Sequence, residues 1–174
     1  MADMKPLLLA VSLLVAAPAL AEAPAPSAPQ CTGAPASLPA GMEGWSSPRP
    51  IKGGTALGNA TVLIPGTAAD AALLPTPSVH YPVRPEQPGG SVSHGGLFRF
   101  TVVEAGRYRI ALGGPAWIDL VSDGKTIASV AHGHGPECSG IRKMVDFDLK
   151  PGIYLVQIAG SGTPSLVLMA SRVA

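Results

Sequence analysis

The chain has few charged residues and, after its first residues, no long apolar stretch. Charged residues make up 13% of the 174 residues and the net charge is +1, so no basic face of the nucleic-acid-binding kind is present. The later apolar segment 166–170 is only as long as a strand, so we expect no membrane span in the mature chain. No stretch repeats apolar residues every 3.6 positions, which argues against long helices.

Residues 1–21 have the pattern of a cleaved secretory signal peptide. Lys5 gives a positive start, and residues 7–17 form an apolar run too short to span a bilayer. Ala19 and Ala21 then supply the small residues that a signal peptidase reads. We therefore expect an exported protein, either periplasmic or secreted. No cysteine follows the apolar run closely, so a lipid anchor is not expected.

Two cysteines are present, Cys31 near the expected mature N-terminus and Cys138 within a histidine-rich segment. In an oxidising compartment such a pair most simply forms a disulfide, which here would close a loop of about 107 residues. The alternative makes Cys138 a thiolate ligand of a metal, as in a copper site.

Proline and glycine divide the chain. Residues 22–50 are rich in proline, alanine and serine and are typical of an extended arm, whereas 51–174 are long enough for one domain with its own core. Within that domain, 65–96 contains recurrent prolines and is predicted to be a long irregular loop.

The rest of the domain alternates apolar and polar residues in the manner of strands. Phe98 and Phe100 flank Arg99, for example, and Ser122–Lys125 has the composition of a hairpin turn. These patterns predict an all-β fold, a single antiparallel β-sandwich of Greek-key or jelly-roll type. The expected strands are 60–64, 97–102, 107–112, 116–121, 126–131, 145–149, 153–158 and 166–173.

Two tyrosines occupy equivalent places in this pattern. Tyr108 and Tyr154 each follow a strand and a tight glycine turn, which predicts two corners in which the ring is buried and the hydroxyl bonds the turn backbone. The core predicted around them contains Phe98, Phe100, Ile110, Val145, Phe147 and Val156.

The segment 129–143 holds the densest set of reactive side chains. His132, His134 and Glu137 lie within six residues, and imidazole and carboxylate are groups that bind metals or move protons. One interpretation is a solvated glycine-rich loop. The other is a site for a transition metal such as copper, zinc or iron, or for a small polar ligand, in which His80, His94, Glu86 or Glu137 would complete the ligand set around His132 and His134.

The other polar groups are expected to have ordinary surface roles. Asp119, next to Trp117, is interpreted as solvent-facing or bonded to a turn, and Lys143 as solvated or paired with Glu137 or Asp146. No G-x-S-x-G turn is present, so a serine nucleophile is not indicated.

From residue 97 to 173 the order of motifs resembles the pre-peptidase C-terminal type of exported β-sandwich, which carries "aGxY", "W-x-D-L", "dG" and "L-x-PGxY" in turn. The segments "PVRPEQPGGSVSHGG", "AWIDLVSDGK", "SVAHGHGPECSGIRKMVDF" and "PGIYLVQIAG" are similar to a group of small exported bacterial proteins that carry the label homogentisate 1,2-dioxygenase. The label implies a small non-haem metal-dependent dioxygenase that uses His132, His134 and Glu137. Our main expectation is a binding or structural module, with this enzyme as the alternative.

Overall fold

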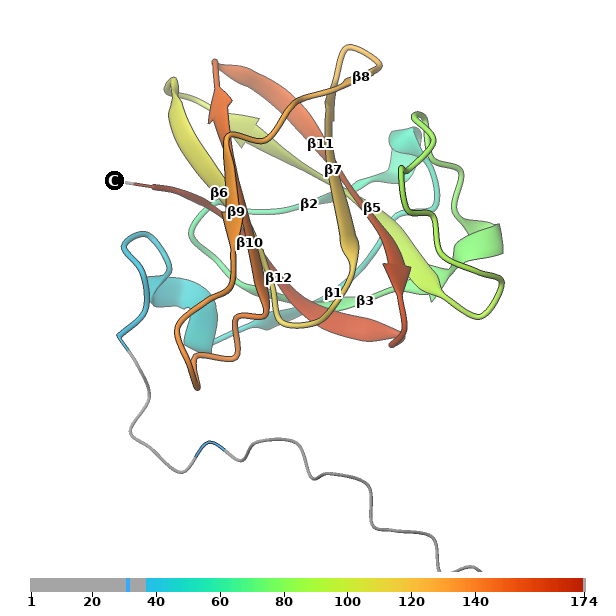
Figure 1. The fold of residues 1–174 in the computed structure, drawn as a ribbon. Helices are drawn as coiled ribbons and strands as arrows, with labels where there is room; N and C mark the ends of the chain where they lie inside the picture. Colours follow the sequence, from blue (N-terminus) through green and yellow to red (C-terminus); the bar gives the residue numbers. More distant parts are fainter. Residues whose placement is uncertain (1–30, 32–36, 174) are drawn as a thin grey trace, which may run out of the picture. The chain divides into compact units, whose positions relative to one another are not determined.

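A computed structural model describes Cys31 and residues 37–173 and shows an all-β fold built from two sheets (Figure 1). Three short 3-10 helices accompany the strands: η1 (Glu43–Ser46), η2 (Leu57–Asn59) and η3 (Thr76–Ser78). The strands are β1 (Arg49–Lys52), β2 (Thr61–Val62), β3 (Ala69–Ala72), β4 (Leu74–Pro75), β5 (His94–Val102), β6 (Gly106–Leu112), β7 (Trp117–Ser122), β8 (Lys125–Thr126), β9 (Ala131–Gly133), β10 (Lys143–Leu149), β11 (Gly152–Ser161) and β12 (Ser165–Arg172).

The strands form the predicted sandwich. The first sheet has the order β1-β3-β12-β6-β10-β9, and the second has the order β2-β5-β11-β7-β8, with β4 also paired to β5. Most neighbours are antiparallel, as predicted, but the pairs β1–β3 and β2–β5 are parallel. The reason is that the chain leaves the first sheet after β1, adds β2 to the second sheet and returns for β3. A crossover of this kind places two successive strands of one sheet in the same direction.

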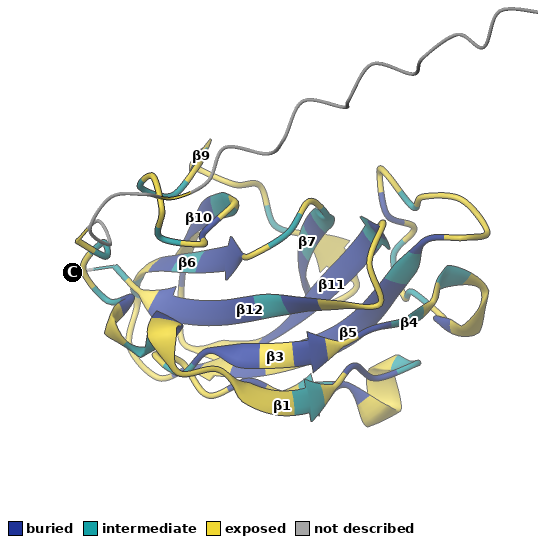
Figure 2. Cartoon of the chain, turned by 90° about the horizontal axis from the view of Figure 1, so that it is seen from below, coloured by how far each residue is buried: buried dark blue, intermediate teal, exposed yellow. Residues whose placement is uncertain are grey.

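The main core lies between the sheets and contains every residue that the alternation predicted for it (Figure 2). Phe98, Phe100 and Val156 come from the second sheet and are at most 1% exposed. Ile110, Val145 and Phe147 face them from the first sheet. Because strand residues alternate between faces, the polar neighbours of these residues point away from the core.

Both tyrosine corners are present. Tyr108 is buried and its hydroxyl donates to the main-chain oxygen of Glu104 at 3.1 Å, and Tyr154 does the same to Lys150 at 3.0 Å. Each ring centroid lies 6.0 Å from that of Phe100. The repeated motif therefore packs the first residues of β6 and of β11 against the same ring, that of Phe100.

Segments outside the sandwich cover both outer faces. Met42 and Trp45, at η1, pack on Ala111 and Met169 of the first sheet. Val79 and the partly buried Tyr81 pack on the second sheet. These two smaller cores tie part of the predicted arm and part of the predicted loop to the domain.

Two expected segments differ in detail. The expected loop 65–96 contains β3, β4 and the start of β5, because β3 is hydrogen-bonded on both sides despite its strand-poor alanines. The expected strand 126–131 is divided: β8 ends at Thr126, and the chain crosses to the first sheet before Ala131. The predicted hairpin turn is confirmed, with positive φ at Asp123 and Gly124.

The Cys31–Cys138 disulfide is formed, with the two Cα atoms 5.4 Å apart, so neither sulfur is the thiolate of the alternative metal site. The predicted signal peptide and residues 22–30 and 32–36 of the arm lie outside the described residues. Among the residues that the structure does describe, no helix has the length and apolar composition needed to cross a membrane.

Candidate functional site

The two sheets leave a cleft between the β7 side of the second sheet and the β9–β10 end of the first. It consists of two adjoining hollows, of about 520 and 660 Å³, that share Trp117, His132 and Lys143. We call them together the edge cleft. The smaller one, the Arg142 hollow, continues to His134 and Arg142, and the larger one, the Asp119 hollow, continues along β7 toward Val145. Both volumes fall within the range of roughly 300–1,000 Å³ that small-molecule sites occupy.

Lys143 joins the two sides of the cleft. It is the first residue of β10, and its Nζ donates to the main-chain oxygen of Ala116 at 3.1 Å. The same Nζ lies 5.0 Å from the centre of the Trp117 ring, within the range of a cation–π contact. Burial lowers the pKa of Lys143, and the charge of Asp119 opposes this effect. The ammonium group is thus held in a partly dry place with two of its three donors free of protein acceptors in the described residues.

Asp119 lies two residues along β7 from Trp117, on the same face of the strand. Its Oδ1 accepts a hydrogen bond of 2.9 Å from the Trp117 indole. Its Oδ2 is buried and has no hydrogen-bond partner among the described residues. Burial raises the pKa of Asp119, with a further contribution from Glu86, whereas Trp117, Gln157 and Lys143 lower it. An acceptor atom without a partner is costly when buried, and this cost adds to the reasons why the carboxyl group favours its neutral form.

The proline-rich segment after η3 forms the outer wall of the Asp119 hollow through Val83, Arg84 and Glu86. It is held there by the buried side chain of Gln157, whose amide donates to the Val83 oxygen at 2.9 Å and accepts from the Val83 nitrogen at 3.3 Å. Gln157 therefore fastens the main chain of this segment to the outer face of the second sheet. The Tyr81 hydroxyl donates to Ile158 at 2.9 Å, and burial, with Asp119 nearby, raises the pKa of Tyr81 to about 12.

The turn between β9 and β10 forms the outer wall of the Arg142 hollow. The His134 ring donates from Nδ1 to the main-chain oxygen of Arg142 at 2.7 Å, which leaves Nε2 as the available ring nitrogen. Trp45 donates from Nε1 to the Ser139 oxygen at 3.0 Å, and Cys138 carries the disulfide. The turn that carries His134 and Arg142 is thus held by two connections to the N-terminal segment, the Trp45 hydrogen bond and the disulfide.

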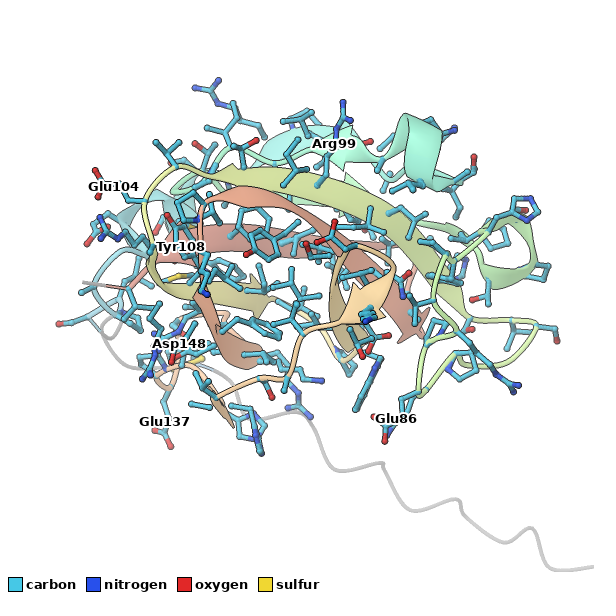
Figure 3. All side chains as sticks on the ribbon, turned by 90° about the horizontal axis from the view of Figure 1, so that it is seen from above. Glu86, Arg99, Glu104, Tyr108, Glu137 and Asp148 are labelled. Carbon is cyan, nitrogen blue, oxygen red and sulfur yellow. A yellow bond between two sulfur atoms is a disulfide. The ribbon has the colours of Figure 1, made fainter. Side chains whose placement is uncertain are left out.

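The structure divides the five residues predicted to bind a metal. His132 and His134 both line the Arg142 hollow and are exposed, whereas His80, His94 and Glu137 line neither hollow. His94 is half-buried at the start of β5 with its Nδ1 unpaired among the described residues. Glu137 points away from the body of the domain in Figure 3.

These positions do not form a metal site. Within residues 37–173 and Cys31, no group of three or more histidine, cysteine, aspartate or glutamate side chains is placed to hold a metal ion. Three or four ligands are the usual requirement for a transition metal. The geometry therefore gives no support to the metal prediction, or to the dioxygenase set His132, His134 and Glu137.

Sequence reasoning missed the part that Trp117, Asp119 and Lys143 take in the cleft. Asp119 is half-buried and bonded to an indole, where a solvent-facing or turn-bonded carboxylate was expected, and Lys143 contacts Ala116 and Trp117 in place of Glu137 or Asp146. The available signal was the alternation of Trp117 and Asp119 with buried Ile118 and Leu120, which places an aromatic ring beside a carboxylate.

No protein-family model matches the chain, and the comparison with curated proteins also gives no match.

Proposed function

We propose that this chain is an exported β-sandwich binding module that takes a small polar ligand in the edge cleft. The observation that carries the proposal is that Trp117 and Lys143 lie where the two hollows meet, with Asp119 beside Trp117 in the lining of the larger one. Together they offer an apolar ring, a half-buried carboxyl group and an ammonium group with free donors. Ligand sites combine an apolar wall with a few convergent polar groups in this way.

Binding of this kind needs no metal. The cleft recognises its ligand through hydrogen bonds and charge, and the walls that carry these groups are already held by Gln157, Tyr81 and the disulfide. A preformed site loses little conformational entropy when the ligand binds, which favours affinity. The proposal therefore retains the small polar ligand of the sequence prediction and omits the metal.

Export is part of the proposal. The Cys31–Cys138 disulfide is the form expected in an oxidising compartment, and residues 1–21 have the signal-peptide pattern. The resemblance to pre-peptidase C-terminal sandwiches also remains a proposal, which rests on the order of the sequence motifs between residues 97 and 173.

The test is a thermal-shift screen of the periplasmically purified protein against sugars, amino acids, nucleotides and small acids. A ligand at a hundred times its dissociation constant stabilises a protein by about 2.7 kcal/mol, which is a shift of several degrees for a domain of this size. The variants Trp117→Ala and Asp119→Asn should each reduce the shift, while Thr101→Ala, an exposed change on the second sheet, should leave it intact. Hits that stabilise all four proteins equally would place the ligand outside the cleft.

A chelator gives a second arm of the same screen. Addition of EDTA should change neither the melting temperature nor the response to any hit, because no group of metal ligands is assembled in the described residues. A large loss of stability or of binding in EDTA would contradict the proposal and restore the metal interpretation.

A further inference from the structure

The Arg142 hollow has a one-sided distribution of charge. Its lining includes His132, His134, Arg142 and Lys143, and among all its lining residues there is no aspartate or glutamate. Trp117 and Gln87 add an aromatic and an amide side chain. A hollow lined by cations and histidines favours negative charge, because the low-dielectric walls strengthen the attraction.

The charge of Arg142 is available to a ligand. Its main chain is fixed, since the nitrogen donates to the Leu112 oxygen at 2.8 Å and the oxygen accepts from His134. Its side chain is exposed and takes part in none of the ion pairs of the described residues, which join Arg107 to Asp148, Arg109 to Asp146 and Arg172 to Glu104. A guanidinium group on a fixed backbone can offer two parallel N–H donors to a carboxylate or a phosphate.

The facing wall consists of two glycine turns. A side chain at Gly89 would meet Ser93 and the main chain of Gly160, and both glycines have positive φ. Gly89 and Gly160 therefore add no side chain to this part of the lining, where Gln87 is the neighbouring residue with a long side chain.

We propose that the Arg142 hollow binds the anionic group, a carboxylate or a phosphate, of the small ligand that occupies the edge cleft. The inference rests on the proposed function and specifies its ligand class. Arg142 pairs with the anion in two-point fashion, and Lys143 supplies a second positive charge with free donors. His132 and His134 line the same space from β9 and the turn that follows it.

Two carboxylates oppose this field from neighbouring elements. Asp119 of β7 interacts with Lys143, and Glu86 of the proline-rich segment lies at the Asp119 hollow. Both carboxylates line the Asp119 hollow and not the Arg142 hollow, so the lining around Arg142 keeps its positive charge.

The experiment is an NMR titration of the mature, oxidised protein with inorganic phosphate and, separately, with acetate, against chloride at equal ionic strength. We expect saturable shifts of the main-chain signals of Gly133, Arg142 and Lys143, which line the Arg142 hollow. The two probes distinguish a phosphate-bearing ligand from a carboxylate-bearing one by their relative affinity.

Arg142→Ala should weaken binding of the better probe roughly tenfold or more, the usual effect of losing a charge-assisted hydrogen bond. Arg99→Ala is the matched control, because Arg99 is an exposed arginine on the side of the molecule opposite Glu86 (Figure 3). It should leave binding unchanged.

Three results would overturn the inference: no saturable shift with either probe up to 50 mM, unchanged affinity in Arg142→Ala, or equal losses in the Arg142 and Arg99 variants. Failure here is distinguishable from failure of the proposed function. Neutral ligands that depend on Trp117 and Asp119 would leave the cleft function standing and remove only the anionic class.

Discussion

Reduction of the Cys31–Cys138 disulfide is the perturbation whose size the structure fixes best. The two cysteines are 107 residues apart, so the bond closes one long loop that contains β1 to β9, and only β10, β11 and β12 lie outside it. The loop-entropy model assigns a crosslink of this length about 4.7 kcal/mol of stabilisation, through restriction of the unfolded chain. This is a large part of the roughly 5–15 kcal/mol that stabilises an ordinary domain.

The reduced protein should nevertheless remain folded. Met42 and Trp45 hold the N-terminal segment on the first sheet through buried contacts, and the Trp45 indole bonds Ser139 beside the disulfide. These contacts persist when the sulfurs separate. The free energy of unfolding therefore decreases because the reduced unfolded chain gains conformational entropy, and not because folded contacts are lost.

The assay is urea unfolding of the oxidised protein and of the double variant Cys31→Ser with Cys138→Ser, which avoids mispaired thiols. With a slope of about 2 kcal/mol per molar urea, the midpoint should fall by about 2 M. The slope itself should increase, because the uncrosslinked unfolded chain exposes more surface. A midpoint that moves by less than about 0.5 M, or two freely alkylated thiols in the periplasmic protein, would refute the reasoning.

Three further predictions concern single side chains. Tyr154→Phe removes the corner hydroxyl bond to Lys150 and should lower the free energy of unfolding by about 1 kcal/mol, measured in urea. Asp146→Ala leaves Arg109 without its partner in the least exposed of the ion pairs in residues 37–173, and should cost about 3–5 kcal/mol. Folding raises the pKa of Asp119, so this carboxyl destabilises the fold as the pH rises through its folded value. Asp119→Asn should therefore be at least as stable as the wild type at pH 7, with the difference absent near pH 3, and a clear loss at pH 7 would contradict the assigned direction.

The sandwich could be predicted because its signals are local. Phe98 and Phe100 alternate with Arg99, as expected for a strand with one buried face. The dipeptide Asp123–Gly124 is a strong signal for a hairpin turn. Each tyrosine corner bonds a carbonyl group only four residues away in the sequence. The two parallel edge pairs were missed because neither β1 nor β3 was expected to be a strand, and because the sequence of a strand does not record which strand will lie beside it. That choice follows from the route of the chain between the sheets.

The site could be predicted less well. The histidines were grouped by their closeness in the sequence, whereas the packing of the segments decides which side chains lie together. His80 and His94 share a proline-rich stretch, yet neither lines the cleft that holds His132. Packing of Val79 and Tyr81 on the second sheet fixes the course of that stretch. Conversely, Trp117 and Lys143 come from different sheets and meet only because the strands β7 and β10 flank the same open side of the sandwich.

The surroundings of Asp119 and Lys143 also support the proposal that the cleft binds a ligand. Burial raises the pKa of the carboxyl and lowers that of the amine, so both groups lose part of their preference for the charged form when the chain folds. A purely structural pair would gain by closer contact or by apolar replacement, as buried ion pairs generally do. Here Lys143 turns to the Trp117 ring and to Ala116, and Asp119 keeps one oxygen unpaired among the described residues. Partly buried ionisable groups with shifted pKa values in the lining of a cleft are typical of functional sites, which is the reason why we place the proposed ligand here.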